Sequence, residues 1–414
     1  MIRRNPREDA AAPDGSDLPG SPTPLYAIAR LPRRGQRLRA ILLAAGEGSR
    51  LRPYTVDKPK PMVRAANKPI AQHVVEALVA NGVKDVTFVV GYHRATVQSH
   101  FGDGRRFGAR IDYAPQEALT GTAAALAAVP RPKEPFLVLN ADNVIDAALV
   151  KAVLSAHDDG PAVAVHRSEV PSRYGVAVLD GARVERILEK PRDPPSEWVN
   201  TGVYRLPPGA HDLATRLAAH TGAGLTDVLQ AMLDDGTRVE GVKTEGLWSD
   251  AVYPWDLLRV HADVLAAGLA TERAPAGVEA GRHVLVGEEC SFGPGVVLGT
   301  GTCVGDNVEI GPHCVLENCV VYGDVKIGAG SILQNTIVGE GTRIGPRFTA
   351  LSGPCEARTS DGWHKLDDFG AVIGEDARIG GCATTLPGAV VGNRTRLAPG
   401  RALSGSVEDG SIVV

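Results

Sequence analysis

Residues 40–62 have the sequence AILLAAGEGSRLRPYTVDKPKPM, an apolar run that ends in a glycine-rich stretch followed by basic residues. The run over 40–45 has the length and composition of a buried β-strand. Glycines directly after a strand let backbone amide groups approach an anion, and Arg50 and Lys60 add positive charge nearby. The stretch therefore predicts a strand followed by a phosphate-binding loop.

Strand and helix patterns alternate through the chain that follows. Apolar runs typical of strands occupy residues 86–90 and 136–140, and helical patterns occupy 70–80 and 147–156. Strands that alternate with helices in this way form βαβ units around a mostly parallel sheet. We therefore expect one α/β domain over residues 38–270.

The C-terminal part, residues 281–414, repeats with a period of six residues. One side chain, nearly always apolar, recurs in each repeat, and the phase slips twice. This period is typical of a parallel β-helix, whose stacked coils bury one apolar column. Residues 346–370 break the period and predict a loop inserted into the coil. The recurring residues are Val286, Phe292, Leu298, Val304, Ile310, Leu316, Ile327, Leu333, Val338, Ile344, Ile373, Ile379, Thr385, Val391 and Leu397.

The composition limits the class of protein. Apolar residues make up 43% and charged residues 22%, and a net charge of −4 argues against a nucleic-acid partner. No apolar run reaches the ~18 to 20 residues that span a bilayer, so no membrane partner is expected. The six cysteines show no paired CxxC spacing, which fits a reduced cytoplasmic compartment. Residues 1–37 lack apolar periodicity and predict a flexible extension without a chemical role.

At residues 43–62 the chain resembles the sugar-1-phosphate nucleotidyltransferases, whose signature is close to LAAGxGxRLxP followed by KPKPM. It is most similar to the subgroup that carries a left-handed β-helix. That subgroup includes the bifunctional N-acetylglucosamine-1-phosphate uridyltransferase/acetyltransferases and archaeal-type glucose-1-phosphate thymidylyltransferases. The resemblance covers about residues 38–400. It implies an α/β nucleotidyltransferase fold, with a Rossmann-like mostly parallel sheet, followed by a left-handed parallel β-helix of hexapeptide repeats.

The resemblance assigns Gln116 to the nucleotide base. A side-chain amide presents a donor and an acceptor together, as a uracil or thymine edge requires, so UTP or dTTP is favoured. Two alternatives stay open: a polar turn ahead of a helix over residues 122–128, and an enzyme that uses GTP or ATP. The implied catalytic residues are Arg50 and Lys60, and the implied nucleotide-binding residues are Ala45, Gly46, Gly48, Gln116, Gly121 and Thr122.

Two aspartates are implied as magnesium ligands. Asp142 comes just after the predicted strand 136–140, where α/β folds place their ligands. Its alternative role is to end the strand or to cap a helix. The run Trp248-Ser249-Asp250 resembles a family stretch that makes Asp250 the second ligand. Asp256 is the alternative second ligand, although it could instead cap the helix that follows.

The sugar side is implied by three further segments. The Tyr174-Gly175 turn resembles a segment whose backbone contacts a sugar hydroxyl, and Asn200-Thr201-Gly202 resembles the segment that holds the ring. Glu189 would contact hydroxyl groups, and Lys190 would contact the sugar phosphate. The alternative for the last two is an ordinary solvated Glu-Lys pair. The implied sugar-phosphate residues are Gly175, Glu189, Lys190, Asn200 and Thr201.

The sequence as a whole predicts Mg²⁺-dependent transfer of a nucleotidyl group from a nucleoside triphosphate to a sugar or cyclitol 1-phosphate, with release of pyrophosphate. The sugar phosphate is already an anion, so the site must offset charge repulsion and align an in-line attack rather than supply a general base. The β-helix is expected to join copies into a homo-oligomer.

Two other functions compete with this one. Acetyl transfer at the β-helix would need a coil histidine, but residues 329–337 contain none, and His313 and His364 are the nearby candidates. A non-catalytic regulatory subunit would be expected to lose the phosphate and metal residues. Arg50, Lys60 and Asp142 are all present, which favours an enzyme.

Overall fold

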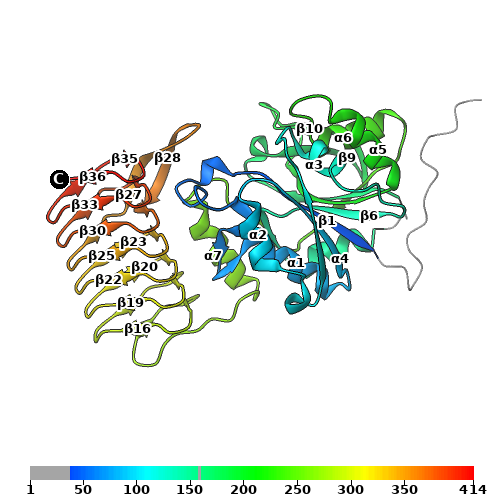
Figure 1. The fold of residues 1–414 in the computed structure, drawn as a ribbon. Coiled ribbons are helices and arrows are strands. Elements are labelled where there is room, and N and C mark those ends of the chain that lie inside the picture. The colour runs from blue at the N-terminus through cyan, green and yellow to red at the C-terminus, as the bar shows by residue number, and fades with distance from the viewer. Residues whose placement is uncertain (1–37, 157–159) are drawn as a thin grey trace, which may run out of the picture.

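The computed structural model describes residues 38–156 and 160–414, and Figure 1 shows an α/β layer structure beside a long stack of short strands. The extension predicted for residues 1–37 lies outside the described residues. No helix in the described part of the chain is both long enough and apolar enough to cross a membrane.

A nine-stranded sheet forms the centre of the α/β domain. Its strands β5, β4, β1 and β6 are parallel, whereas β11 runs antiparallel to both β6 and β8. The predicted parallel sheet is therefore confirmed around β1, and the other half of the sheet is mixed. In order across the sheet, the strands are β5 (Arg110–Pro115), β4 (Asp85–Val90), β1 (Arg39–Ala44), β6 (Phe136–Asn140), β11 (Trp198–Leu206), β8 (Ala162–Arg167), β12 (Glu240–Lys243), β10 (Arg183–Glu189) and β9 (Gly175–Asp180).

Helices cover both faces of this sheet, which is why its central strands are almost continuously apolar. Helices α1, α2 and α4 pack on one face, and α3, α5 and α6 pack on the other. The predicted helix over 147–156 is confirmed, although it ends at Leu154. The helices are α1 (Ile70–Ala80), α2 (Arg94–Phe101), α3 (Thr122–Ala127), α4 (Ala147–Leu154), α5 (Pro208–Leu217), α6 (Leu225–Asp234) and α7 (Asp256–Ala266).

The C-terminal stack consists of three seven-stranded parallel sheets, which confirms the predicted parallel β-helix. The first coil sheet contains β14 (Glu279–Ala280), β17 (Val297–Leu298), β20 (Val315–Glu317), β23 (Ile332–Gln334), β26 (Thr349–Ala350), β31 (Thr384–Thr385) and β34 (Ala402–Leu403). The second contains β15 (Leu285–Val286), β18 (Cys303–Val304), β21 (Val320–Val321), β24 (Ile337–Val338), β29 (Ala371–Ile373), β32 (Ala389–Val391) and β35 (Ser406–Val407). The third contains β16 (Ser291–Phe292), β19 (Glu309–Ile310), β22 (Lys326–Ile327), β25 (Arg343–Ile344), β30 (Arg378–Ile379), β33 (Arg396–Leu397) and β36 (Ile412–Val413).

The six-residue pattern marks the interior of these coils. The recurring side chains from Val286 to Leu397 are buried in one apolar cluster, apart from Phe292, which is half-buried, and Thr385, whose buried hydroxyl has no partner among the described residues. Each coil is too small to bury an apolar surface by itself, so the stacking of coils supplies the core.

A two-stranded hairpin interrupts the coil between β26 and β29. It consists of β27 (Gly353–Thr359) and β28 (Gly362–Phe369), which pair antiparallel. The first coil sheet continues past it, because Thr349 pairs with Ile332 on one side and with Thr384 on the other. The segment 346–370, predicted as a loop, thus contains β26 as well as both hairpin strands.

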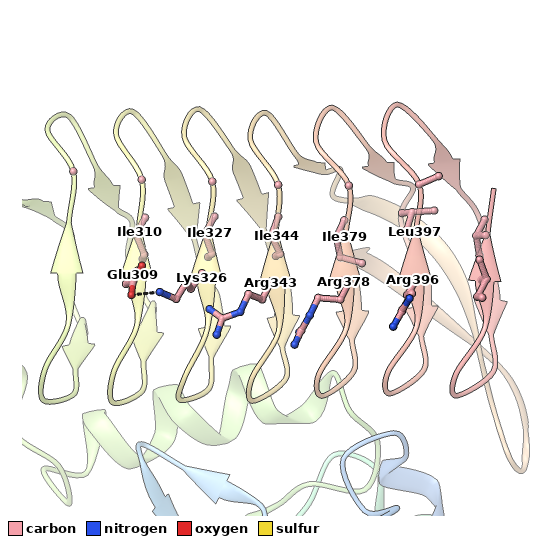
Figure 2. Close-up of a pocket in the computed structure, with 18 of the residues that line it drawn as sticks. Glu309, Ile310, Lys326, Ile327, Arg343, Ile344, Arg378, Ile379, Arg396 and Leu397 are labelled. Atoms are coloured by element: carbon pink, nitrogen blue, oxygen red, sulfur yellow. Dashed lines mark hydrogen bonds and ion pairs between the residues drawn. The ribbon is translucent and has the colours of Figure 1, made fainter.

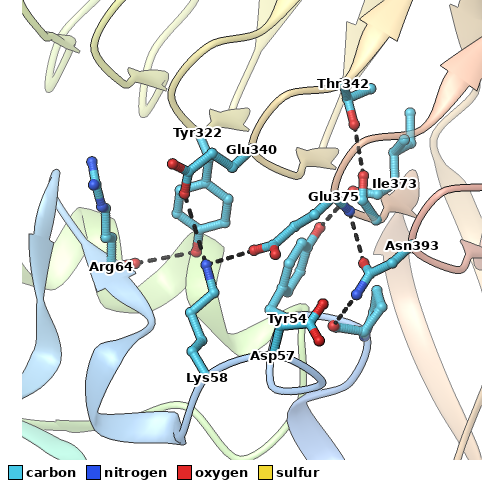
Figure 3. Close-up of polar contacts among 12 residues, drawn as sticks. Tyr54, Asp57, Lys58, Arg64, Tyr322, Glu340, Thr342, Ile373, Glu375 and Asn393 are labelled. Atoms are coloured by element: carbon cyan, nitrogen blue, oxygen red, sulfur yellow. Dashed lines mark hydrogen bonds and ion pairs between the residues drawn. The ribbon is translucent and has the colours of Figure 1, made fainter. Parts of the chain in front are cut away.

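The second coil sheet packs directly on the α/β domain. Its outward side chains share a buried cluster with Tyr54, with α7 and with the short strand β2 (Arg64–Ala65), which pairs with β3 (Lys68–Pro69). The Tyr54 hydroxyl lies 3.1 Å from the carbonyl oxygens of both Ile337 and Ile373. The rings of Tyr54 and Tyr322 meet edge to face, 5.5 Å apart. The segment after the glycine-rich loop is therefore held by the β-helix (Figure 3).

Polar contacts add to this interface. The Lys58 ammonium lies 2.6 Å from Glu375, and the Asn393 amide donates to the carbonyl oxygen of Pro53 at 2.9 Å. Burial raises the pKa of Glu375, and Lys58 opposes that rise. An ion pair that is mostly removed from water is costly to break from one side, so these contacts fix the two domains against each other.

Replacing Tyr54 tests how firmly the domains are held. Tyr54→Phe removes one buried hydroxyl donor, whereas the Ile373 carbonyl oxygen keeps its bond from the Gly339 amide, so we expect the free energy of unfolding to fall by about 1 kcal/mol. Urea denaturation measures this change. Arg394→Ala is the control, because Arg394 pairs with Asp57 at the exposed edge of the same interface, and no measurable change is expected. An equal loss of stability in the two variants would contradict the assignment.

Candidate active site

Two adjoining hollows open at the carboxyl ends of β1 and β6. The larger has a volume of about 430 Å³, and the smaller has a volume of about 280 Å³. Ligands in open α/β sheets bind at this edge. The hollows share lining residues, so they form one site with two compartments. The shared residues are Gly48, Lys60, Gly121, Thr122, Asn140 and Asp142.

Asp142 and Asp250 meet in the larger compartment although they are distant in sequence. Asp142 follows β6 directly, and Asp250 is the last residue of β13 (Trp248–Asp250). Strand β13 pairs antiparallel with β7 (Asn143–Ile145), and this register sets Asp250 opposite Asn143. The pairing of two short strands therefore brings both carboxylates to one point.

The Lys60 ammonium lies between these two carboxylates. Its Nζ is 2.6 Å from Asp250 Oδ1 and 3.1 Å from Asp142 Oδ2, and the side chain is 11% exposed. Burial lowers the pKa of Lys60, but attraction and hydrogen bonds to Asp142 and Asp250 outweigh it and raise that pKa above its usual value. Burial and the nearby Asp142 raise the pKa of Asp250, against the effect of Lys60. We take Lys60 to be charged, because two acidic groups face it.

The glycine-rich loop packs against the Lys60 side chain. Gly48 has a φ of +76°, and a Cβ there would lie 2.6 Å from Lys60 Cβ, so only glycine fits. Within the part of the chain that the structure describes, the amide groups of 46–48 donate to no protein acceptor. Arg50 follows in η1 (Ser49–Leu51) and lines the larger compartment. Amides and a guanidinium together suit a polyphosphate.

The smaller compartment contains Ala45, Gly46 and Gln116. The Gln116 amide nitrogen donates to the carbonyl oxygens of Ala118 at 3.0 Å and Gly121 at 3.3 Å. These bonds use the donor end of the side chain and leave Oε1 as an acceptor. Gln116 is 8% exposed, so a ligand at this oxygen would be shielded from water.

Gly121 and Thr122 connect this compartment to helix α6. Gly121 has a φ of +124°, and a Cβ there would lie 2.2 Å from the carbonyl oxygen of Ala223. Thr122 begins α3 but does not cap it, because its hydroxyl accepts from the Leu225 amide at 2.9 Å. These two residues therefore set the distance between α3 and α6.

The far wall of the larger compartment carries the predicted sugar residues. Gly175 begins β9 and Glu189 ends β10, in direct register with each other. The Thr226 hydroxyl donates to Glu189 Oε2 at 3.0 Å, and the Lys190 ammonium lies 3.4 Å from Glu189 Oε1. Lys190 has a φ of +41° at the turn after the strand. All of these residues line the compartment.

Neighbouring residues of β11 have different environments. The Asn200 amide donates to the Tyr204 hydroxyl at 2.6 Å, and Asn200 lines the compartment. Thr201 does not line it. Its side chain is buried, and its hydroxyl donates to the carbonyl oxygen of Ala164 at 2.9 Å. The Thr201 carbonyl oxygen instead accepts from the Trp248 indole at 3.0 Å, which ties β11 to β13.

Asp256, the alternative metal ligand, serves another purpose. Its Oδ2 accepts from the amide groups of Val252 at 2.9 Å and Tyr253 at 2.8 Å, at the start of α7. Asp256 does not line either compartment, whereas Asp250 does. This geometry favours Asp250 as the acidic partner of Asp142.

Some lining residues were not found by sequence reasoning. Arg173 adds a fourth cation to Arg50, Lys60 and Lys190, and Thr226 and Tyr204 orient Glu189 and Asn200. Burial raises the pKa of the neighbouring Tyr174 to about 12, so its hydroxyl remains a donor. Arg173 directly precedes the Tyr174-Gly175 motif, which was the available signal for it. Thr226 and Tyr204 lie in ordinary amphipathic patterns, which gave no signal that these residues line a site.

The residues of this site fit a hard divalent cation. Asp142 and Asp250 both contact the Lys60 ammonium, so both reach the same region of the compartment. The described residues contain no group of three or more His, Cys, Asp or Glu side chains that could hold a metal ion. Mg²⁺ commonly takes one or two carboxylates and completes its octahedron with water and substrate phosphates. Two carboxylates beside a polyphosphate pocket match that requirement.

A third hollow, of about 950 Å³, lies along the third coil sheet (Figure 2). It is larger than the two compartments but contains no convergent pair of carboxylates. Instead, it is an open face with one charged side chain in each of five successive coils and buried aliphatic side chains between them. We therefore place the chemistry at the α/β domain. The charged residues of this face are Glu309, Lys326, Arg343, Arg378 and Arg396.

Comparison with known proteins fits the geometry of the α/β site. Residues 39–267, more than half of the chain, match the nucleotidyl transferase family. The chain belongs to this family. Residues 280–407 match the GMPPB C-terminal domain, which corresponds to the β-helix. The expected family and fold class are thus confirmed, and the protein is a nucleotidyltransferase.

Relatives with assigned activities extend over both domains of this nucleotidyltransferase. The mannose-1-phosphate guanylyltransferase of Mycobacterium tuberculosis is 32% identical, over 71% of this chain and 82% of the relative. A glucose-1-phosphate thymidylyltransferase of Streptomyces antibioticus is 33% identical, over 74% and 92%. The bifunctional protein GlmU of Methanococcus maripaludis is 27% identical, over 90% and 96%. All three are similar to this chain over most of its length.

The contact between Gly48 and Lys60 gives a direct test of the loop. Gly48→Ala forces a side chain into a left-handed backbone and against Lys60 Cβ, so we expect the free energy of unfolding to fall by about 1 to 3 kcal/mol. Thermal or urea unfolding measures this loss. Gly46→Ala is the matched control, because nothing lies within 4 Å of its added Cβ. Equal stability of the two variants would show that the loop does not have this conformation.

Proposed function

We propose that this chain transfers a nucleotidyl group from a nucleoside triphosphate to a sugar 1-phosphate and releases pyrophosphate, with Mg²⁺ as cofactor. The observation that carries the proposal is the buried ammonium of Lys60 between Asp142 and Asp250, where the two compartments join. A site that combines two carboxylates with several cations suits a metal ion and polyanionic substrates together. Membership of the family supports the reaction class.

The chain's own residues would hold and align two anions. Arg50 and the 46–49 loop bind the leaving pyrophosphate, and Lys60 contacts the α-phosphate. Lys190, on the opposite wall, binds the phosphate of the sugar. Attack on the α-phosphorus then needs in-line placement and charge compensation, and the nucleophile is already an anion.

A divalent metal ion is general in this family, and we assign Mg²⁺ to Asp142 and Asp250. When bound there, it would supply positive charge that offsets the repulsion between the anionic substrates and stabilises the transition state. Asp142 and Asp250 would supply its protein ligands. Lys60 would keep its contact with one carboxylate, and its other N–H groups would donate to the α-phosphate.

The orientation of Gln116 limits which nucleotide base the smaller compartment can bind. Because its amide nitrogen already donates to two backbone oxygens, only Oε1 can meet a ligand, and it needs a donor. Uracil, thymine and guanine carry a ring N–H at the centre of the pairing edge, whereas adenine and cytosine carry a bare ring nitrogen there, whose lone pair would face Oε1, beside an exocyclic amino group. We therefore propose UTP, dTTP or GTP as the substrate. Relatives named as guanylyl- and thymidylyltransferases agree with this set.

A substrate panel tests the reaction and the base together. We expect Mg²⁺-dependent pyrophosphate release with UTP, dTTP or GTP and one hexose 1-phosphate, and little release with ATP or CTP. Gln116→Leu should lower kcat/KM for the preferred nucleotide on the order of 10-fold, because the base loses its buried acceptor. Gln98→Leu, at an exposed position of α2, is the control. Release that is fastest with ATP would overturn the base assignment, and no release with any pair would overturn the reaction.

Removal of the central ammonium tests the catalytic assignment. Lys60→Ala should lower turnover on the order of 10²-fold, the scale for losing one preorganised charged donor. Steady-state pyrophosphate release measures this. Lys68→Ala should leave turnover close to that of the unmodified chain, because Lys68 pairs with Glu76 near the surface and does not line the compartments. Near-normal turnover of Lys60→Ala would refute the role given to Lys60.

A further inference from the structure

The hairpin of β27 and β28 reaches from the β-helix to the segment that follows Asp250. The Tyr253 hydroxyl donates to Asp361 Oδ2 at 3.0 Å, and the Tyr253 ring lies 4.2 Å from the His364 ring. Trp255 stacks on Tyr253 at 5.1 Å and also contacts His364. The hairpin turn therefore contacts the chain three residues after the second carboxylate of the site.

The other side of Tyr253 contacts cations of the active site. Burial raises the pKa of the Tyr253 phenol, and Arg50 lies close enough to its hydroxyl to oppose that rise. The Arg173 guanidinium carbon lies 5.7 Å from the centre of the Tyr253 ring. Both arginines line the larger compartment. Tyr253 itself is 8% exposed, and its backbone amide is held by Asp256. A nearly buried phenol thus joins the hairpin to Arg50.

The hairpin presents Asp361 in a fixed orientation. Oδ1 of Asp361 accepts from the Thr359 hydroxyl at 2.6 Å and lies 3.1 Å from His364 Nε2, which leaves Oδ2 for Tyr253. Burial would raise the pKa of Asp361, but these hydrogen bonds outweigh it and lower that pKa, so the carboxylate is charged at neutral pH. A charged acceptor makes a stronger bond to the phenol than a neutral one does.

We propose that the hairpin is a positioning element of the active site, in which Asp361 orients Tyr253 and Tyr253 orients the Arg50 guanidinium toward the triphosphate. This inference rests on the proposed function. Arg50 is exposed and has a long side chain, so an unanchored Arg50 would lose rotamer entropy when it binds phosphate. An anchor that removes this cost in advance strengthens nucleotide binding. Asp361 and Tyr253 would act through Arg50 and would not touch the reacting atoms.

The experiment compares Asp361→Ala and Tyr253→Phe with the full-length chain in steady-state kinetics. We expect KM for the nucleoside triphosphate to rise about 5- to 10-fold in each variant, the scale of one lost hydrogen bond. We expect KM for the sugar 1-phosphate to stay unchanged. Calorimetric titration with inorganic pyrophosphate should show the same weakening. Asp367→Ala is the matched control, because it removes an exposed carboxylate from the same hairpin and should leave both KM values unchanged.

The Arg50→Ala background shows whether the effect passes through Arg50. If it does, adding Asp361→Ala to Arg50→Ala should change the pyrophosphate affinity no further. An Asp361→Ala variant that matches Asp367→Ala would overturn the inference. So would an equal rise in both KM values, or an undiminished effect in the Arg50→Ala background. Absence of activity in the unmodified chain would instead overturn the proposed function.

Discussion

The buried ammonium of Lys60 between Asp142 and Asp250 is the contact on which the rest of the site depends. A charge at this depth is tolerated only with close opposite charges, so Lys60 and Asp250 each require the other, and Asp142 is a second acidic partner of Lys60. Their positions come from different elements. Lys60 lies in η2 (Lys60–Met62), Asp142 follows β6, and Asp250 ends β13. The register between β7 and β13 is therefore as important to the site as the carboxylates themselves.

The segment that leads to Lys60 is confined from two sides. Gly48 packs on the Lys60 side chain within the site, while Tyr54 and Lys58 bind the second coil sheet. Displacement of the β-helix would consequently move the segment that positions the central ammonium. The hairpin makes a second connection, from Asp361 to Tyr253, which lies beside Arg50 and Arg173 of the site. The position of the C-terminal coils therefore affects the geometry of the active site, because a closely packed interior does not absorb a displacement.

The two compartments divide recognition between two kinds of contact. The smaller one presents the oxygen of a Gln116 amide whose donor end is used internally, so in the proposed reaction it would accept a hydrogen bond from the base. The larger one presents charges, with Arg50, Arg173 and Lys190 on its walls and the carboxylates at its centre. Charges recognise phosphate and metal in any of these substrates, whereas a single fixed acceptor discriminates among bases.

The sequence alone determined the elements that follow local rules. The apolar run before Gly46, the six-residue period of the coils and the position of Asp142 after β6 all depend on neighbours in the chain. Tertiary structure decided the rest. The side chain of Thr201 is directed into the sheet, Asp256 accepts from two backbone amides just before α7, and Asp361 meets Tyr253 across 108 positions. Side-chain direction and long-range contact depend on register and domain packing, and a local pattern of residue types does not encode those distances.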